Sequence, residues 1–241
     1  MSNWSFSEKY PGQTQESLMA KAKKIATTVA GLGEWGPDNG AYVVFAACAK
    51  EQALFAGRAG AVADLDDYIL KWLIAFSNGY ANRGSQRHGK AVQTVADSMI
   101  NCIVAAAFSQ TTAQADLVVL HHRQAMAAEN ILGHLLEEYI ASSVAPQGWF
   151  CCWGTSVRAV DFCSKDGRLL QVKNRDNSEN SSSVKVRDGT VIEMWFRTYS
   201  QTGATNWPKL QAITGSTTLS EEGFKQFVQD TFKANPKLLS A

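Results

Sequence analysis

The amino-acid sequence predicts an α/β protein in which a long helical N-terminal region precedes a smaller region of strands and helices. Apolar residues recur at helical spacing through the first 144 residues, whereas short apolar or alternating segments from residue 148 onward indicate strands. With 241 residues, of which 45% are hydrophobic and 19% charged, the chain can bury a sizeable core in one or two domains. We expect a helical region over residues 1–126 and a core over residues 127–241, joined in one compact unit.

Composition and patterning exclude several classes of protein. No apolar run approaches the roughly 18 residues that a membrane span needs, and residues 1–10 lack the basic and apolar segments of a secretory signal. The five cysteines show no CxxC spacing, so neither a zinc site nor a disulfide framework is expected, and we predict a cytoplasmic location. The net charge of +1 argues against a bulk electrostatic binder of nucleic acid but leaves room for a local basic cleft.

The expected helices follow from apolar spacing and from the residues that end each segment. In the first helix, Leu18, Ile25 and Val29 fall on one face, and glycines followed by Pro37 end the segment. Aspartates at the start of the third helix suit the positive end of its dipole. The expected helices cover residues 14–32, 41–55, 62–76, 91–108, 112–126, 129–144 and 220–233, with a glycine-punctuated loop over residues 79–89.

Strands are expected after residue 148. The aromatic segment 148–153 and the weakly alternating segment 157–163 precede a turn at residues 164–167, after which residues 168–173 alternate polar and apolar. Residues 190–199 fit either a strand or a helix, and we favour a helix.

The turn between the two predicted strands determines which side chains share a face. A two-residue turn pairs Asp161 with Val172 and puts Gln171 on the opposite face. A three-residue turn that ends at a left-handed Gly167 pairs Asp161 with Gln171 instead. Because Lys173 lies two residues beyond Gln171, the second register places a carboxylate, an amide and an ammonium side by side.

Such a cluster suits hydrolysis of a phosphodiester bond. A carboxylate and a neighbouring oxygen ligand can hold a hard divalent cation, typically Mg²⁺, which polarises a phosphoryl oxygen. A lysine beside the cation can orient the attacking water or stabilise developing charge. The spacing from Asp161 to Gln171 and Lys173 is also compatible with an ordinary solvated hairpin.

The surrounding segments resemble those of the PD-(D/E)xK nuclease superfamily. The matching segments are Gly133-x-x-x-Glu137, Gly148-Trp149, residues 159–162 (AVDF) and residues 169–175 (LLQVKNR). The resemblance implies that Glu137, Asp161, Gln171 and Lys173 are the catalytic residues, and that Asp161, Gln171 and the Val172 carbonyl hold Mg²⁺. Gln171 stands where the family usually has an acid, which puts a second tightly held metal in doubt. Glu138 competes with Glu137 for the helix position, and we favour Glu137 on the family spacing.

A closer resemblance is to SinI-type type II restriction endonucleases. It rests on residues 169–183 (LLQVKNRDNSENSSS), residues 132–140 (LGHLLEEYI) and residues 195–197 (WFR), and it spans about residues 130–207. It implies a restriction-endonuclease-like core, with a central mixed sheet flanked by helices. It further implies a homodimer that cuts a short palindromic DNA duplex, GGWCC in that family, alongside a cognate DNA methyltransferase.

The polar segment after the catalytic strand is expected to contact DNA. Asparagine and arginine read adenine and guanine edges, and serine contacts bases or phosphates. The expected contacts are Asn174, Arg175, Asn177, Ser178, Asn180, Ser181, Ser182, Ser183, Lys185 and Arg187, with Arg83 and Arg87 on the glycine-punctuated loop. An exposed surface loop without DNA contacts is the other interpretation of such a segment.

Three other functions remain open from the sequence. A DNA repair or junction nuclease could use the same core and would cut structured or damaged DNA. A catalytically inactive DNA-binding module is kept open by Gln171. A purely helical interaction protein would have no affinity for DNA.

Overall fold

The structure is a computed structural model that describes residues 4–57, 61–87, 97–176 and 191–239 of the chain. Within those residues the strands form a four-stranded sheet in the order β1-β2-β3-β4. β1 and β2 are antiparallel, as are β2 and β3, whereas β3 and β4 run parallel, so the sheet is mixed. The strands are β1 (Trp149–Cys151), β2 (Phe162–Ser164), β3 (Leu169–Arg175) and β4 (Ile192–Thr198).

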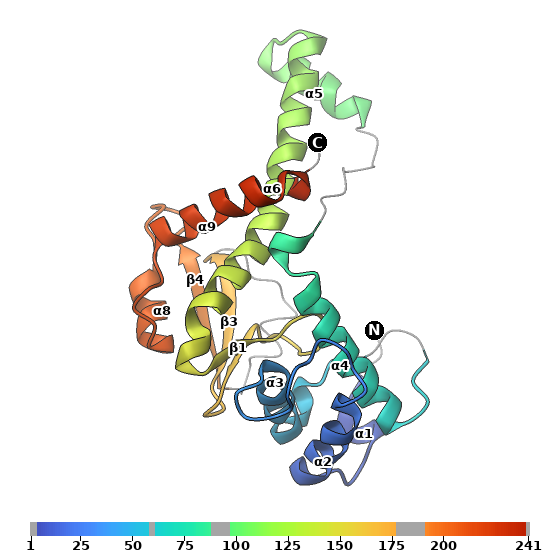
Figure 1. The fold of residues 1–241 in the computed structure, drawn as a ribbon. Helices are drawn as coiled ribbons and strands as arrows, with labels where there is room; N and C mark the ends of the chain where they lie inside the picture. The colour runs from blue at the N-terminus through green and yellow to red at the C-terminus, as the bar shows by residue number, and fades with distance from the viewer. Residues whose placement is uncertain (1–3, 58–60, 88–96, 177–190, 240–241) are drawn as a thin grey trace.

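Helices cover both faces of this sheet (Figure 1). The N-terminal helices are α1 (Phe6–Lys9), α2 (Gln15–Ala26), α3 (Gly40–Lys50) and α4 (Leu65–Ala81), followed by α5 (Ser98–Phe108). The remaining α-helices are α6 (Thr112–Val144), α8 (Trp207–Thr214) and α9 (Glu221–Ala234). Short 3₁₀ helices are η1 (Gln52–Leu54), η2 (Gly84–Gln86), η3 (Ala145–Gln147) and η4 (Pro236–Leu238).

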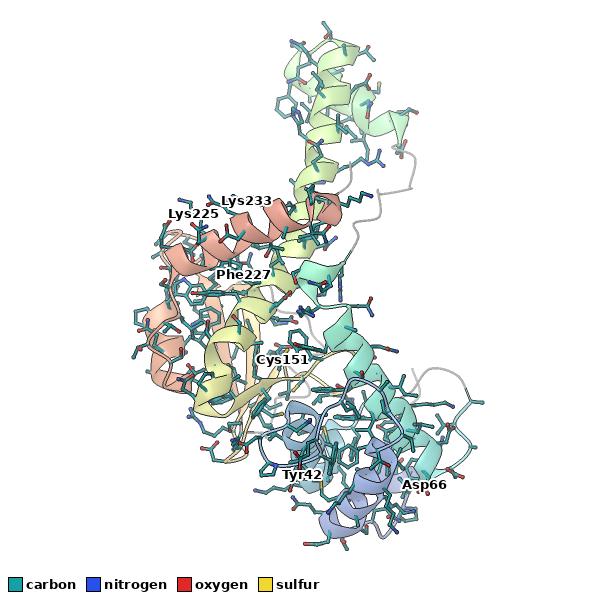
Figure 2. All side chains as sticks on the ribbon, in the orientation of Figure 1. Tyr42, Asp66, Cys151, Lys225, Phe227 and Lys233 are labelled. Atoms are coloured by element: carbon teal, nitrogen blue, oxygen red, sulfur yellow. The ribbon has the colours of Figure 1, made fainter. Side chains whose placement is uncertain are left out.

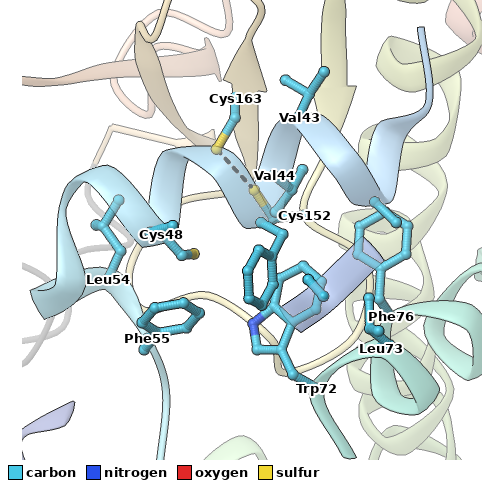
Figure 3. Close-up of a cluster of buried hydrophobic side chains, with 14 of the residues drawn as sticks. Val43, Val44, Cys48, Leu54, Phe55, Trp72, Leu73, Phe76, Cys152 and Cys163 are labelled. Carbon is cyan, nitrogen blue, oxygen red and sulfur yellow. Dashed lines mark hydrogen bonds between the residues drawn. The ribbon is translucent and has the colours of Figure 1, made fainter. Parts of the chain in front are cut away.

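A first apolar core joins the N-terminal helices to one face of the sheet. Phe45 of α3 and Trp72 of α4 are fully buried in it, together with Cys163 of β2 and Leu169 of β3. Figure 3 shows Trp72 beneath α3 and close to Cys152. The indole Nε1 of Trp72 donates a hydrogen bond to the Ser156 carbonyl at 2.9 Å, so the one polar atom of this buried side chain has a partner. The N-terminal helices are therefore part of the packing of the sheet.

A second apolar core lies on the opposite face, where α6, α8 and α9 pack. Leu136 and Ile140 of α6 meet Leu170 of β3 and Trp195 of β4. Successive residues of β3 point to opposite faces, so Leu169 belongs to the first core and Leu170 to the second. A strand buried on both faces explains why its sequence is more apolar than simple alternation predicts.

α6 is one helix of 33 residues, whereas the sequence predicted two helices over residues 112–126 and 129–144, so that division is wrong. The two residues between the predicted segments, Ala127 and Ala128, are strong helix formers, and neither is a helix breaker. A capping box at Thr111 and Gln114 begins the helix. α6 crosses the expected boundary at residue 126, and the division into two regions stays a prediction.

The preference for a helix over residues 190–199 is also wrong, because Ile192–Thr198 form β4. β4 pairs in parallel with β3, with Gln171 opposite Met194 and Val172 opposite Trp195. Its β-branched and aromatic residues suit a pleated surface, and the free edge of β3 supplies the backbone partners that sequence periodicity does not reveal.

Other predicted elements are confirmed with shifted ends. The first two helices end earlier, at Ala26 and Lys50, and the third runs on to Ala81. α1 and α8 were not predicted, because each is short. The start of the helix predicted over residues 91–108 lies partly outside the described residues.

α5 and the first half of α6 extend away from the sheet (Figure 1). Among the described helices, none is by itself long and apolar enough to cross a membrane. The α5–α6 pair meets that criterion only when its helices are taken together, and they are bent by 117°.

Candidate active site

Two adjacent glutamates on α6 have different surroundings. Glu138 is buried and accepts hydrogen bonds from Arg83 Nε at 2.8 Å, from the Ser85 backbone N at 2.7 Å and from Ser85 Oγ at 2.6 Å. Its charge is matched by Arg83, and the contact ties η2 to α6. Glu137 instead lines a cavity that it shares with Asp161. The structure thus places Glu137, the favoured residue, at the site and makes Glu138 an anchor.

η2 approaches α6 closely because position 84 is a glycine. A Cβ at Gly84 would lie 2.9 Å from the carbonyl carbon and oxygen of His134. The Asn235 side chain holds η2 from another side, donating to the Ser85 carbonyl at 3.1 Å and to the Arg87 carbonyl at 2.9 Å. These contacts fix the backbone of Arg87 beside the cavity.

Asp161 is held just before β2 by main-chain hydrogen bonds. Its N–H donates to the Leu170 carbonyl at 2.9 Å, and its carbonyl accepts from Cys152 N at 2.8 Å. Its carboxylate Oδ2 accepts from Val172 N at 2.7 Å. The preceding chain passes through Ala159 with φ of 56°, a left-handed conformation that is uncommon for a residue with a Cβ.

The register of the hairpin is the one that the three-residue turn predicts. Phe162 pairs with Leu170, and the same register carried on by one residue places Asp161 opposite Gln171. Gly167 has φ of 87°, the left-handed conformation that such a turn requires. Of the two registers that the sequence left open, the structure has the one that places Asp161 and Gln171 side by side.

β3 brings Gln171 and Lys173 to the same side of the strand. The positive charge of Lys173 opposes the rise in the pKa of both Glu137 and Asp161. Gln171 is buried, and its Oε1 accepts no hydrogen bond from any described residue. A buried acceptor without a partner costs about 1–3 kcal/mol, so this oxygen is available for a ligand.

The two carboxylates resist ionisation. Burial, and then the charge of Asp161, raise the pKa of Glu137 to about 8, against the opposing charges of Arg87 and Lys173. Burial raises the pKa of Asp161 to about 6, although the hydrogen bond from Val172 N and the charge of Lys173 oppose this. Neighbouring half-buried carboxylates with raised pKa values are typical of functional sites, and a bound cation would favour their charged forms.

The cavity beside these carboxylates has a volume of about 300 Å³. Arg87 and His134 line it together with Glu137 and Asp161. Burial and the charge of Arg87 lower the pKa of His134, so the imidazole is neutral at neutral pH. The N-terminal region therefore contributes a cationic side chain to the site.

The donor set fits one hard divalent cation. Asp161 supplies a half-buried carboxylate, Gln171 a buried free oxygen, and the Val172 carbonyl lies between Gln171 and Lys173 on the same strand. Within the described ranges no group of three or more His, Cys, Asp or Glu side chains could hold a metal. A cation here would depend on amide and main-chain oxygens as well as on carboxylates.

The predicted DNA contacts are only partly described. Arg83 is engaged by Glu138 and lies over the Tyr80 ring at 4.9 Å, and Asn174 Oδ1 accepts from Arg197 Nε at 2.9 Å. Arg175 is exposed at the end of β3. Asn177, Ser178, Asn180, Ser181, Ser182, Ser183, Lys185 and Arg187 lie outside the described residues. DNA contact by any of these residues stays a prediction.

The class of the protein follows from the family whose sequence pattern it matches. The model of the SinI restriction endonuclease family matches residues 53–234, about three quarters of the chain. The chain belongs to the SinI restriction endonuclease family. The matched range includes α4, α6 and all four strands, and the mixed sheet with helices on both faces agrees with the restriction-endonuclease-like fold predicted from the sequence.

Two curated relatives are restriction enzymes by name. The chain is 48% identical over 142 residues to the type II restriction enzyme Eco47I of Escherichia coli. This aligned region covers 57% of this chain and 62% of the relative. It is 45% identical over 141 residues to the type II restriction enzyme SinI of Salmonella infantis, covering 56% of this chain and 61% of the relative. The chain thus spans about three fifths of the length of the relatives that it matches.

Sequence reasoning missed the contribution of the N-terminal region to the site. Arg87 was predicted as a DNA contact only, and His134 was not among the predicted site residues, yet both line the cavity. The Arg83–Glu138 pair was missed because 55 residues separate its members. The only local signal was Gly84, whose missing side chain permits the close approach to α6.

Proposed function

We propose that this protein is a Mg²⁺-dependent type II site-specific deoxyribonuclease that hydrolyses phosphodiester bonds in a short palindromic DNA duplex. The observation that carries the proposal is that Glu137 and Asp161 line one cavity, while the charge of Lys173 acts on both carboxylates and the buried Oε1 of Gln171 lies on the same hairpin. Membership of the SinI restriction endonuclease family supports it. The family resemblance further suggests a GGWCC-like site.

The proposed roles follow from the chemistry of each side chain. Asp161, Gln171 and the Val172 carbonyl would hold Mg²⁺, with Glu137 acting through a water. When bound, the cation supplies Lewis-acid polarisation of the scissile phosphate and lowers the pKa of a water ligand. Lys173 donates a hydrogen bond that orients the attacking water and stabilises charge that develops on the phosphate.

Glu137 and Asp161 are proposed to bind protons in the metal-free site and to release them when a cation binds. At neutral pH the raised pKa of Glu137 keeps this carboxyl group protonated while no cation is present. Binding of a divalent cation favours the ionised carboxylates, so cation binding releases protons to solvent.

Recognition of DNA is proposed for the basic and polar residues around this site. Arg87, which lines the cavity, is proposed to contact the scissile strand. The other proposed contacts with the duplex are Arg83, Asn174, Arg175 and the segment from Asn177 to Arg187. We further propose that the enzyme acts as a homodimer in the cytoplasm, with a cognate DNA methyltransferase that protects host sites, since two-fold symmetry suits a palindromic site.

Digestion of unmethylated phage DNA tests the proposal. Discrete fragments whose sequenced ends share one short palindrome support a type II restriction enzyme. Cleavage confined to branched or damaged DNA would identify a repair or junction nuclease instead. Binding of duplex DNA in Mg²⁺ without cleavage at any enzyme concentration would identify an inactive binding module, for which the amide of Gln171 would be the natural explanation.

A further inference from the structure

α5 is a helix without a polar face and without a buried residue. Its eleven residues, Ser98–Phe108, include no charged side chain. Helices that are apolar on all sides are normally buried, whereas Figure 2 shows side chains radiating outward from α5 and the adjoining part of α6, beyond the rest of the molecule. We name α5 and residues 112–129 of α6 the distal hairpin.

The distal hairpin exposes most of the large apolar side chains that the described residues expose. The eight are Met99, Ile100, Ile103, Phe108, Leu117, Val118, Leu120 and Met126. Their exposed fractions run from 43% to 71%. At roughly 150–200 Å² for a full side chain of this size, they expose about 650–850 Å² per molecule.

This area matches what a stable protein interface needs, which is about 800 Å² per partner. An isolated monomer rarely exposes so large an apolar patch. We propose that the distal hairpin is a dimerisation surface, and that the hairpins of two copies of this chain pack side by side as a four-helix bundle.

Charge favours a second copy over DNA or an anionic lipid surface. Residues 97–129 contain one basic residue, Arg123, against three acidic residues, Asp97, Asp116 and Glu129. Phosphate groups would therefore find no cationic surface here. An apolar partner is needed, and in a two-fold contact each apolar side chain meets the same surface on the other copy.

The position of the distal hairpin relative to the active site supports a two-fold axis that runs roughly along α6. The same helix carries Leu120 in the hairpin and Glu137 at the site, about 25 Å apart at 1.5 Å per residue. With such an axis, both active sites lie at the same end of the dimer, where each can face one strand of a duplex. The existence of a homodimer and the placement of its active sites on a duplex rest on the proposed function, whereas the location of the interface rests on the exposed apolar side chains.

Light scattering and sedimentation velocity, without DNA or Mg²⁺, test the interface. The wild type is expected to be a dimer at micromolar concentration. Ile103→Glu and Phe108→Glu should each weaken dimerisation by roughly 100-fold or more, because every dimer would bury two unpaired carboxylates. Ile74→Glu on α4 is the matched control, since Ile74 is 41% exposed but lies outside the hairpin, and it should remain a dimer.

Cys102 gives a second measurement that needs no disruptive variant. It is the exposed cysteine of α5, whereas the other four cysteines are buried. Its reaction with a thiol reagent should be slow in the wild-type dimer and should accelerate on dilution and in Ile103→Glu. A wild-type monomer at tens of micromolar, a dimer unaffected by both glutamate variants, or flotation of the wild type with phosphatidylcholine vesicles would each overturn the proposal. Lys173→Ala should still dimerise, so loss of cleavage and loss of the interface are distinguishable.

Discussion

Replacing Glu137 by glutamine is expected to stabilise the metal-free protein, and increasingly so as the pH rises. The folded-state pKa of Glu137 is about 8, above its ordinary value of 4.5. Stability from the protonated carboxyl is thus fully present below about pH 4.5 and is lost as the pH rises through about 8. Glutamine carries no charge at any pH, so it avoids this loss.

The size of the effect follows from the interval between the ordinary pKa of Glu137, 4.5, and its folded-state pKa of about 8. At roughly 1.4 kcal/mol per pH unit, the interval sets an upper bound of about 5 kcal/mol. Relaxation around the buried charge and water penetration reduce the effective cost to about 2–3 kcal/mol near pH 8. For a chain of this length, that corresponds to a gain in Tm of roughly 5–10 °C at pH 8 and little change near pH 5.

Thermal unfolding in EDTA between pH 5 and pH 9 measures this gain, and Glu138→Gln is the matched control. Glu138 is paired with Arg83 and hydrogen-bonded to Ser85, so removing its charge leaves these partly buried donors without their anion. We expect that variant to lose about 2 kcal/mol or more. The same substitution at adjacent positions should therefore change stability in opposite directions. A Glu137→Gln variant no more stable than wild type at pH 8 would refute the assignment of Glu137 to the buried site.

Three further predictions concern the cation, the amide and a tight backbone contact. The affinity for Mg²⁺, measured by calorimetry, should rise with pH up to about 8, because Glu137 and Asp161 must lose their protons; a pH-independent affinity would contradict this. Gln171→Glu should bind Mg²⁺ about 10-fold more tightly yet melt at a lower temperature in EDTA at pH 8, because it adds a third carboxylate at a buried position. An unchanged Mg²⁺ affinity would place Gln171 outside the cation site. Gly79→Ala should lower the Tm by roughly 5 °C or more, since its Cβ would lie 2.6 Å from Gly154 Cα, and a variant as stable as wild type would show that this contact relaxes freely.

The sequence limits the register of the site hairpin to two alternatives, and the structure has the one with the three-residue turn. Gly167 can adopt the left-handed conformation of a three-residue turn, and that turn fixes Asp161 opposite Gln171. Glu137 was favoured over Glu138 on spacing, and the environments of the two glutamates agree with that choice. The catalytic roles of these residues stay predictions.

The remaining features depend on contacts between residues far apart in the sequence. β4 forms a strand because β3 offers a free edge, which an apolar run that suits either structure does not reveal. The Arg83–Glu138 pair and the placement of Arg87 at the cavity arise from packing of η2 on α6. The exposure of α5 is likewise visible only in three dimensions, since its sequence is typical of a buried helix.

The most direct test of the central claim is the cleavage of unmethylated duplex DNA by wild type and by Lys173→Ala, each in Mg²⁺ and in EDTA. We predict discrete fragments from wild type in Mg²⁺, no cleavage in EDTA, and a loss of at least about 100-fold in rate for Lys173→Ala with DNA binding retained. Cleavage by Lys173→Ala at the wild-type rate, or cleavage in EDTA, would contradict the placement of the chemistry at this hairpin.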